Sequence, residues 1–236
     1  MADKLEGMMN SWHEKLARLK SKGGVKAAAF GIVKKLFRME VHFLYSMDLA
    51  QQQVLGLKPV RDPCERQAFH FIALTTARDL ALYPHALIEQ LDSQSGQGIA
   101  KLIGSDTGVY ALIDGTNIVS QVNINRSAVV HVDSPTDLDI CLAPGNVFLG
   151  YLFTYPQYRS MGTAAFLIGK VSQNIQKHGY SRILTHIRST NTASLNTFRK
   201  CGWARVGWIL TSTSGRLLLT HCPHRTGISI TAARQI

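Results

Sequence analysis

The order of strand and helix signals along this chain constrains its fold more than any other sequence feature. Apolar, β-rich runs alternate with segments whose apolar side chains recur at helical spacing. Strands are expected at 69–74, 108–113, 117–125, 147–154, 183–187, 206–211 and 216–221. Helices are expected at 77–91, with a break near Pro84, at 162–178 and at 193–200. Strands first, followed by strand–helix–strand–helix–strands, predict an α/β domain with a mixed sheet.

The N-terminal region has a different character. Segments 4–20 and 25–38 carry apolar side chains at helical spacing, with lysines and arginines at the intervening positions. We therefore expect a basic amphipathic helical extension over 1–39, one domain over 40–225 and a C-terminal tail over 226–236. Such helices either pack against protein or lie on an anionic membrane surface, and the sequence allows both.

Targeting and redox signals are consistent with a cytoplasmic protein. The longest apolar run is about seven residues, far short of the roughly 20 needed to cross a bilayer, and no signal-peptide pattern follows the first Met. The cysteines are widely spaced and form no CxxC motif, which favours reduced thiols over disulfides or a zinc site. They are Cys64, Cys141, Cys201 and Cys222.

Charge is distributed unevenly along the chain. Residues 140–236 contain eleven Lys and Arg and no Asp or Glu, whereas residues 39–139 contain twelve Asp and Glu against six Lys and Arg. The last block therefore predicts an anionic ligand, either nucleic acid or a small polyphosphate.

The loop before the helix at 162–178 contains an anion-binding pattern. Arg159, Gly162 and Ala164 form R-x-x-G-x-A between an apolar strand and a helix start. The first N–H groups of a helix have no partner within it, and small residues let a phosphate approach them. The loop lacks the GK[ST] of a P-loop and the dinucleotide GxGxxG.

A second motif follows about thirty residues later. Asn191 to Trp203 reads N-x-x-S-x-x-x-F-x-K-x-G-W after the strand at 183–187. Together, the two motifs resemble the GNAT superfamily of acetyl-CoA-dependent N-acetyltransferases, most specifically over residues 146–210. The resemblance implies an α/β fold whose mixed, mostly antiparallel sheet contains a splayed parallel strand pair and is flanked by helices.

The resemblance also implies an acetyl-CoA site. The loop would bind the pyrophosphate through backbone amides, the strand would pair with the pantetheine arm, and Asn191 would hydrogen-bond that arm. A bulge in the strand would splay it from the next one, so that the thioester enters the gap. The implied cofactor-binding residues are Leu152, Phe153, Thr154, Arg159, Ser160, Met161, Gly162, Thr163, Ala164, Asn191, Ser194 and Lys200.

The catalytic residues are less well indicated, because the chain departs from the family pattern twice. Where the family commonly has a Tyr that protonates the leaving thiolate, this chain has Phe198, so Tyr151, Ser194 or a water would take that role. Where some members have a Glu base, this chain has Asn146.

The remaining candidates for the general base are few. They are His186, Asp137 or Asp139, and a water relay. A backbone N–H within 150–152 would stabilise the oxyanion. The catalytic prediction is thus His186, Asp139 and Tyr151, with no metal, since His221 and His224 lack further ligands nearby.

These motifs lead to one preferred function and two alternatives. The preferred function is transfer of acetyl from acetyl-CoA to a primary amine in a ternary complex, with a cationic amine facing the acidic block through Asp79, Glu89 and Asp92. The first alternative is a longer or carrier-bound acyl donor, with the basic helices docking an acidic carrier protein or a membrane surface. The second is a non-catalytic module that binds acyl-CoA or nucleic acid, although nucleic acid is the less favoured partner. A homodimer is compatible with each.

Overall fold

A computed structural model describes residues 39–50, 69–132, 138–223 and 226–232. The chain divides into two compact units, Met1–Glu40 and Val41–Ile236. The expected helical extension over 1–39 lies outside the described residues except for Met39, which begins the first strand.

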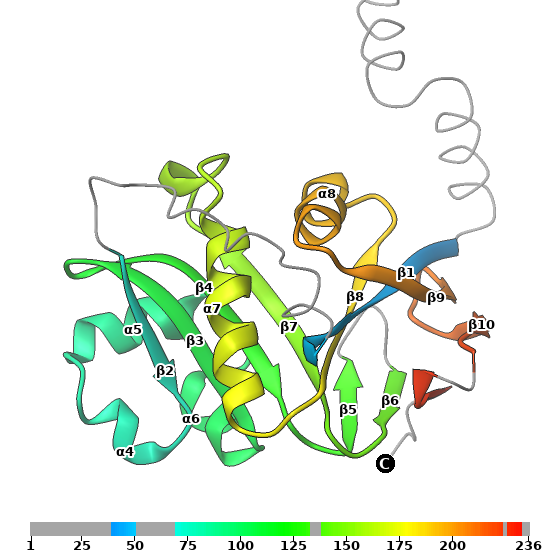
Figure 1. Ribbon diagram of the computed structural model, residues 1–236, viewed down its shortest axis with the longest axis horizontal. Coiled ribbons are helices and arrows are strands. Elements are labelled where there is room, and N and C mark those ends of the chain that lie inside the picture. The colour runs from blue at the N-terminus through cyan, green and yellow to red at the C-terminus, as the bar shows by residue number, and fades with distance from the viewer. Residues whose placement is uncertain (1–38, 51–68, 133–137, 224–225, 233–236) are drawn as a thin grey trace, which may run out of the picture. The chain divides into compact units, whose positions relative to one another are not determined.

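A large sheet is the centre of the second unit (Figure 1). Its eight strands follow the order β10-β9-β1-β8-β7-β4-β3-β2. The strands are β1 (Met39–Asp48), β2 (His70–Leu74), β3 (Thr107–Asp114), β4 (Asn117–Asn125), β7 (Asn146–Thr154), β8 (Arg182–Arg188), β9 (Ala204–Ser212) and β10 (Leu217–His221). All neighbouring pairs with a described register are antiparallel except β7 and β8, which run parallel.

A second sheet has three antiparallel strands in the order β11-β6-β5. They are β5 (Val129–Val132), β6 (Leu138–Leu142) and β11 (Ile228–Ala232). Strand β11 lies in the segment expected to be a tail, yet it pairs with all five residues of β6. Its Ile228 is buried in a cluster with Phe148 and Leu184 of the large sheet, so this segment contributes to the core.

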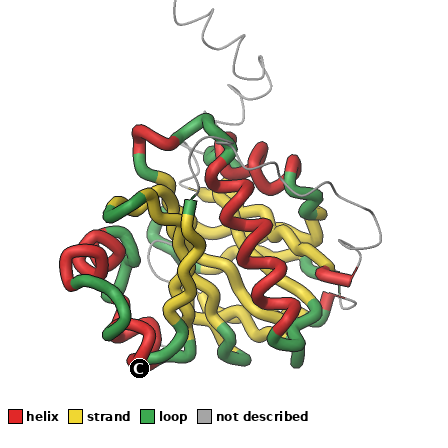
Figure 2. The backbone as a smooth tube through the Cα atoms, turned by 60° about the vertical axis from the view of Figure 1, so that its left-hand side comes forward, coloured by secondary structure: helices red, strands yellow, loops and turns green. Residues whose placement is uncertain are grey.

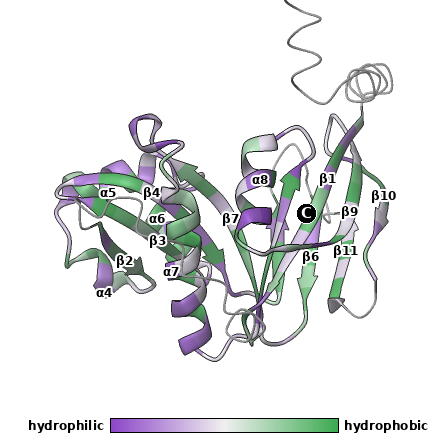
Figure 3. Ribbon diagram, turned by 45° about the horizontal axis from the view of Figure 1, so that its top comes forward, coloured by the Kyte–Doolittle hydropathy of each residue, from purple (hydrophilic) through white to green (hydrophobic). Residues whose placement is uncertain are grey.

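Helices cover both faces of the large sheet. They are α4 (Ala77–Leu80), α5 (His85–Ser93), α6 (Ile99–Gly104), α7 (Thr163–Lys177), α8 (Thr192–Lys200) and the 3-10 turn η1 (Pro156–Tyr158). The longest, α7, lies across the strands in Figure 2, and its mixed colouring in Figure 3 is that of an amphipathic helix.

Side chains along the central strands alternate between the cores on the two faces of the sheet. In β3, Tyr110 and Leu112 belong to the core under α7 and α8, whereas Val109 and Ala111 belong to the core under α5 and α6. Successive strand residues point to opposite faces, so a strand covered on both sides is apolar at every position. Burial of all but the last residue of β3 follows from this arrangement.

The parallel pair β7 and β8 separates partway along its length. Their register runs through Asn146–Arg182, Val147–Ile183 and Phe148–Leu184, and no later pair is in register. On its other side, β7 pairs Gly150 with Asn123 and Phe153 with Gln121, so two residues of β7 lie opposite one of β4. This is a β-bulge. The predicted fold class, with a splayed parallel pair in a mostly antiparallel sheet, is confirmed.

Most of the strands and helices predicted above are present, with ends shifted by one or two residues. The helix expected at 77–91 is two helices, α4 and α5, separated near Pro84 as predicted. Elements without a sequence prediction are the first strand, the short α6 and the three-stranded sheet. None of the helices that the structure describes is long and apolar enough to span a membrane.

Candidate active site

One cavity, of about 600 Å³, lies between the end of β7, the start of α7 and one side of α8. Eleven of the twelve residues predicted to bind acetyl-CoA line it; Met161, in the same loop, is exposed and does not. The lining is Leu152, Phe153, Thr154, Arg159, Ser160, Gly162, Thr163, Ala164, Ala165, Asn191, Ala193, Ser194, Asn196, Thr197 and Lys200. We call it the donor cavity.

The donor cavity contains the N-terminus of α7. Gly162 caps the helix at φ 81°, a left-handed conformation that glycine adopts without steric cost. The first hydrogen bond from within the helix is from Phe166 N–H to the Gly162 carbonyl, so the N–H groups of residues 163–165 have no helical acceptor. Thr163 donates its hydroxyl to the Tyr158 carbonyl at 2.9 Å, which holds the loop against the helix start. The loop therefore presents a cluster of backbone donors to an anion.

Two cationic side chains add positive charge to the donor cavity. Arg159 donates from Nε to the Thr154 carbonyl at 3.0 Å and lies 5.7 Å from the centre of the Phe153 ring. Lys200 lies on the opposite wall, in the last turn of α8. No Asp or Glu is among the lining residues that the structure describes, so the donor cavity favours a polyanion.

Asn191 begins α8 and also lines the donor cavity. Its Oδ1 accepts a hydrogen bond from Ser194 N–H at 3.1 Å, which is the N-cap interaction expected for Asn. Capping and ligand contact are compatible, because the cap uses the side-chain oxygen and the amide nitrogen is a separate donor.

A second cavity, of about 430 Å³, adjoins the same stretch of β7. Its lining is Ser95, Gln97, Lys101, Leu102, Ser105, Thr107, Asn123, Asn125, Ser127, Val129, Val130, His131, Val132, Phe148, Gly150, Tyr151 and His186. We call it the acceptor cavity. Tyr151 lines the acceptor cavity and the next residue, Leu152, lines the donor cavity, so both cavities border the β7 bulge.

The backbone around these cavities is unusual. Among the described residues, three that are not glycine have positive φ, and two of them belong to these cavities: Tyr151 at 48° and Ser160 at 64°. Side chains other than glycine rarely adopt this conformation, and such residues cluster at functional sites. The aromatic ring of Tyr151 reaches Gly96 in the loop between α5 and α6, and thereby closes one side of the acceptor cavity.

Buried polar side chains of β4 hold the acceptor cavity together. Asn123 is 5% exposed and donates its amide to the Ser95 carbonyl at 2.9 Å, and Gln121 donates to the Leu91 carbonyl at 2.9 Å. These bonds tie the central sheet to α5 and to the loop that follows it. Polar residues inside an otherwise apolar strand are the sequence signal for this cavity, and Asn123 and Gln121 are not among the predicted site residues.

His186 lies where the two parallel strands separate. Phe148 of β7 pairs with Leu184 of β8. Gly150 and His186 each lie two residues further along these parallel strands, so both lie level with the bulge. The imidazole packs 5.4 Å from the His42 ring and 5.8 Å from the Phe148 ring. Burial, aided by the nearby His42 and Arg188, lowers the pKa of His186 to about 3. The side chain is thus neutral at physiological pH, with part of its ring at the acceptor cavity.

Asp139, the second predicted base, lines neither cavity among the described residues. It lies on β6, where its Oδ1 is 3.0 Å from Nδ1 of His131 on β5. His131 itself belongs to the acceptor cavity lining, and its side chain is about half exposed. The structure thus connects Asp139 to the cavity through a histidine that the sequence analysis did not single out. Asp137, the alternative named with it, lies outside the described residues.

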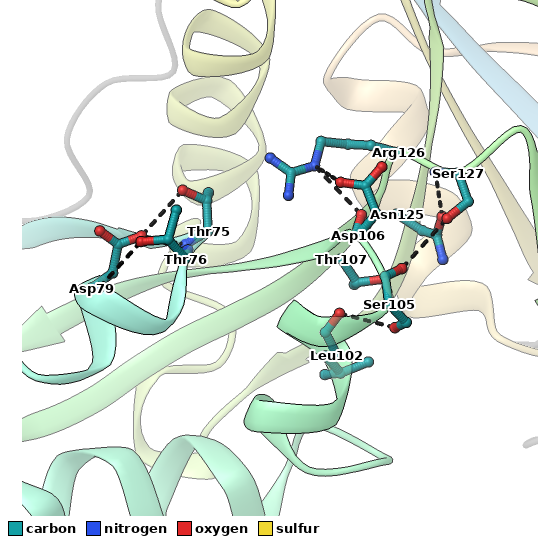
Figure 4. A network of polar contacts seen from close by, with 10 residues as sticks. All are labelled: Thr75, Thr76, Asp79, Leu102, Ser105, Asp106, Thr107, Asn125, Arg126 and Ser127. Carbon is teal, nitrogen blue, oxygen red and sulfur yellow. Dashed lines mark hydrogen bonds and ion pairs between the residues drawn. The ribbon is translucent and has the colours of Figure 1, made fainter.

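The three carboxylates expected to face a cationic substrate are elsewhere. Asp79 caps α4 by accepting from the N–H groups of Thr75 and Thr76, both at 2.7 Å (Figure 4). These bonds lower the pKa of Asp79 against the opposing effect of burial. Glu89 pairs with His85 on the exposed side of α5, and Asp92 accepts from the Ile99 N–H at the start of α6. None of the three lines either cavity, so the expectation that they form the substrate wall stays a prediction.

Phe198 cannot protonate a leaving group and is part of the core. It is 2% exposed and packs edge-on against Trp203, with ring centroids 4.8 Å apart. In the described part of the chain, no group of three or more His, Cys, Asp or Glu side chains is placed to hold a metal ion.

Comparisons with known proteins bear on this site. The family model described as Acetyltransferase (GNAT) family matches residues 83–203, which include all the lining residues of both cavities. No curated protein matches the chain.

Solved structures with a similar fold are distant in sequence. A GNAT-family acetyltransferase from Novosphingobium aromaticivorans is 13% identical over 73% of this chain and 63% of its own, with a TM-score of 0.47. A GCN5-related N-acetyltransferase-like protein from Streptococcus suis is 12% identical over 76% and 65%, also at 0.47. The aminoglycoside N-acetyltransferase AAC(6')-Iy, solved with CoA, is 15% identical over 60% and 93%, at 0.42. This chain spans less than two thirds of the length of the first two.

Proposed function

The chain belongs to the acetyltransferase (GNAT) family, and from this premise we propose that it transfers an acetyl group from acetyl-CoA to a primary amine. The observation that carries the proposal is that both cavities border the β7 bulge. One cavity suits a polyanionic donor, the other suits a small acceptor, and consecutive residues, Tyr151 and Leu152, line them. Direct transfer requires the two substrates to meet at one point.

The donor cavity fits CoA on three counts. The pyrophosphate would bind the backbone N–H groups at the start of α7, where the φ of Gly162 keeps space open. Arg159 and Lys200 would add positive charge for the phosphates. Residues 152–154 form the strand edge for the pantetheine arm, and the amide of Asn191 would bind the same arm.

The bulge positions the thioester and stabilises the charge that develops on it. Beyond Phe148 the β7 edge facing β8 is released from strand pairing. A backbone N–H within 150–152 can therefore donate to the carbonyl oxygen of the thioester as it becomes an oxyanion. Because this donor is backbone held by the sheet, little reorganisation is needed during the reaction.

His186 is the proposed general base. The neutral amine attacks the thioester carbon, a C–N bond forms, and the C–S bond breaks. His186 accepts the proton that the amine loses, directly or through one water, and passes it to solvent. Its burial keeps the imidazole neutral at physiological pH but also makes it a weak base, so it takes the proton only after the C–N bond has formed, when the attacking nitrogen has become more acidic.

The leaving thiolate needs less assistance. A thiol pKa near 8.5, by analogy with cysteine, permits departure as thiolate. We propose that Tyr151, which lines the acceptor cavity beside the β7 bulge, passes a proton through a water to the thiolate to give free CoA, and regains a proton from solvent. Asp139 would act at a distance, by orienting His131 at the edge of the acceptor cavity.

The proposal is tested by calorimetric titration of acetyl-CoA into wild type, Gly162→Glu and Gly179→Glu. Both glycines have positive φ, 81° and 84°, and they flank opposite ends of α7. The two variants therefore carry a matched backbone strain and a matched charge. Gly162→Glu should abolish binding by placing a carboxylate among the phosphate donors, and Gly179→Glu should retain it. Equal binding by all three proteins would refute the donor site, and absence of thiol release with every amine would refute the transferase.

A further inference from the structure

The acceptor cavity contains a charge pattern that bears on the class of amine. Of the side chains lining it, Lys101 is the one with a permanent charge, and no Asp or Glu is among them in the described part of the chain. Lys101 projects from α6, is exposed, and has no ion pair with any described carboxylate. The remaining polar lining consists of neutral amides and hydroxyls, together with two histidines and the Tyr151 phenol.

The described carboxylates near this cavity already have other partners. Asp106 pairs with Arg126 at 3.0 Å, as Figure 4 shows, and Asp139 contacts His131. Asp92 accepts from the backbone at the start of α6. None of these carboxylates lines the acceptor cavity. A polycationic acceptor would therefore enter a cavity whose one fixed charge repels it.

The other part of the lining is apolar. Phe148, Val130 and Val132 belong to one buried cluster, and each also contacts the cavity. Leu102 of α6 adds to this surface. An acceptor that fills the cavity would bury an apolar body against these side chains.

From this pattern, and resting on the proposed function, we infer that the acceptor is a small amine with an apolar body and a separate anionic group, which Lys101 binds. The anionic group is a carboxylate or a phosphate, since an ammonium pairs with either. The absence of carboxylates from the described lining also assists the chemistry. An amine bound near a lysine and in a partly desolvated cavity has a lowered pKa, which favours the neutral form that attacks.

The test compares amines that differ in the anionic group alone. Phenylalanine and phenethylamine share an aromatic body and an amine, and O-phosphoethanolamine and ethanolamine form the corresponding phosphate pair. Spermidine is the polycation. Each is assayed by release of free thiol from acetyl-CoA with wild type, Lys101→Met and Lys170→Met. Lys170 is the matched control, because it lies on α7 over the Phe166 ring and outside both cavities.

We expect Lys101→Met to raise the KM for phenylalanine or for O-phosphoethanolamine about tenfold, as for loss of a charge-assisted hydrogen bond. For the amine of each pair that lacks the anion, the KM should change less than about twofold. Lys170→Met should leave the KM of both amines unchanged. Each amine is compared with itself across wild type and variants, so the different basicities of the two amines in a pair do not affect the result. Whichever pair responds identifies the anion as carboxylate or phosphate.

Three results would overturn the inference. One is a wild-type preference for spermidine, and another is an equal change in both members of each pair on Lys101→Met. The third is the absence of turnover with every probe while acetyl-CoA still binds, which would reject this acceptor class but leave the donor site standing. Failure of acetyl-CoA itself to bind would instead reject the proposed function.

Discussion

The ring of Tyr151 lies directly against Gly96, and a methyl group at Gly96 would come within 2.6 and 2.7 Å of the two Cε atoms of that ring. The contact joins the β7 bulge to the loop between α5 and α6. Both residues have positive φ, 48° and 88°, so neither backbone relaxes easily. One wall of the acceptor cavity therefore depends on a glycine that no motif would identify.

Gly96→Ala should displace the Tyr151 ring and destabilise the protein by about 1–3 kcal/mol, from backbone strain and overlap together. Urea unfolding measures the change. In a Tyr151→Ala background the ring is absent, so Gly96→Ala should lower the free energy of unfolding by measurably less. The difference between the two losses is the coupling energy between the residues. Equal costs in both backgrounds would show that the ring does not rest on Gly96.

His186→Asn should lower kcat by about a hundredfold or more, which is the usual contribution of a general base. His70→Asn, on the exposed edge strand β2, is the control. Because the pKa of His186 is about 3, its titration should not appear in the pH profile of kcat at about pH 5 to 8. In that range kcat/KM should rise with pH as the amine loses its own proton. An acid limb near pH 6.5 that disappears in His186→Asn would contradict this assignment.

The same histidine should make stability depend on pH. The pKa is about 3 in the folded state and about 6.5 in the unfolded chain, so between these values the unfolded state binds more protons. The free energy of unfolding is therefore fully retained above about pH 6.5 and falls progressively as the pH drops toward about 3. His186→Asn should show a shallower fall over this window, measured by urea unfolding at several pH values. If the free energy of unfolding fell equally with pH in wild type and in His186→Asn, a buried neutral His186 would be ruled out.

Asn191→Ser and Asn191→Ala should separate the two roles of Asn191. Serine also caps helices, so it should keep stability, whereas alanine should lose about 1 kcal/mol. Both substitutions remove the amide, and both should therefore raise the KM for acetyl-CoA. If serine restores the KM as well as the stability, the residue acts as a cap alone.

Cys201 should resist alkylation in the folded protein. Burial raises the pKa of its thiol to about 11, so almost none is thiolate at about pH 8. Cys141 and Cys222 are partly exposed and should react first with iodoacetamide, as followed by peptide mass spectrometry. Equal labelling of Cys201 without denaturant would show that its burial is not maintained in solution.

The donor cavity was predictable because its parts are local in sequence. A strand, a loop and a helix start lie within 152–164, and their neighbour on α8 begins at Asn191. Ala193, Asn196 and Thr197 were not predicted, although together with Lys200 they follow the three- and four-residue spacing of one helix face. That spacing was the signal for the rest of this wall.

What the sequence determined by itself was the order of elements, the family and the residues of the loop at the start of α7, since each depends on short-range patterns that a motif contains. The tertiary structure decided the acceptor cavity, whose walls come from the α5–α6 loop, α6, β3, β4, β5, β7 and β8. Their side chains are up to 91 positions apart, from Ser95 to His186, and only sheet pairing brings them together. The same pairing left Asp79, Asp92 and Asp106, among the described carboxylates, at helix caps and in an ion pair outside the cavity lining. Charge counted along the sequence cannot show this, because a carboxylate's effect depends on its distance from the substrate and on the partners that it already has.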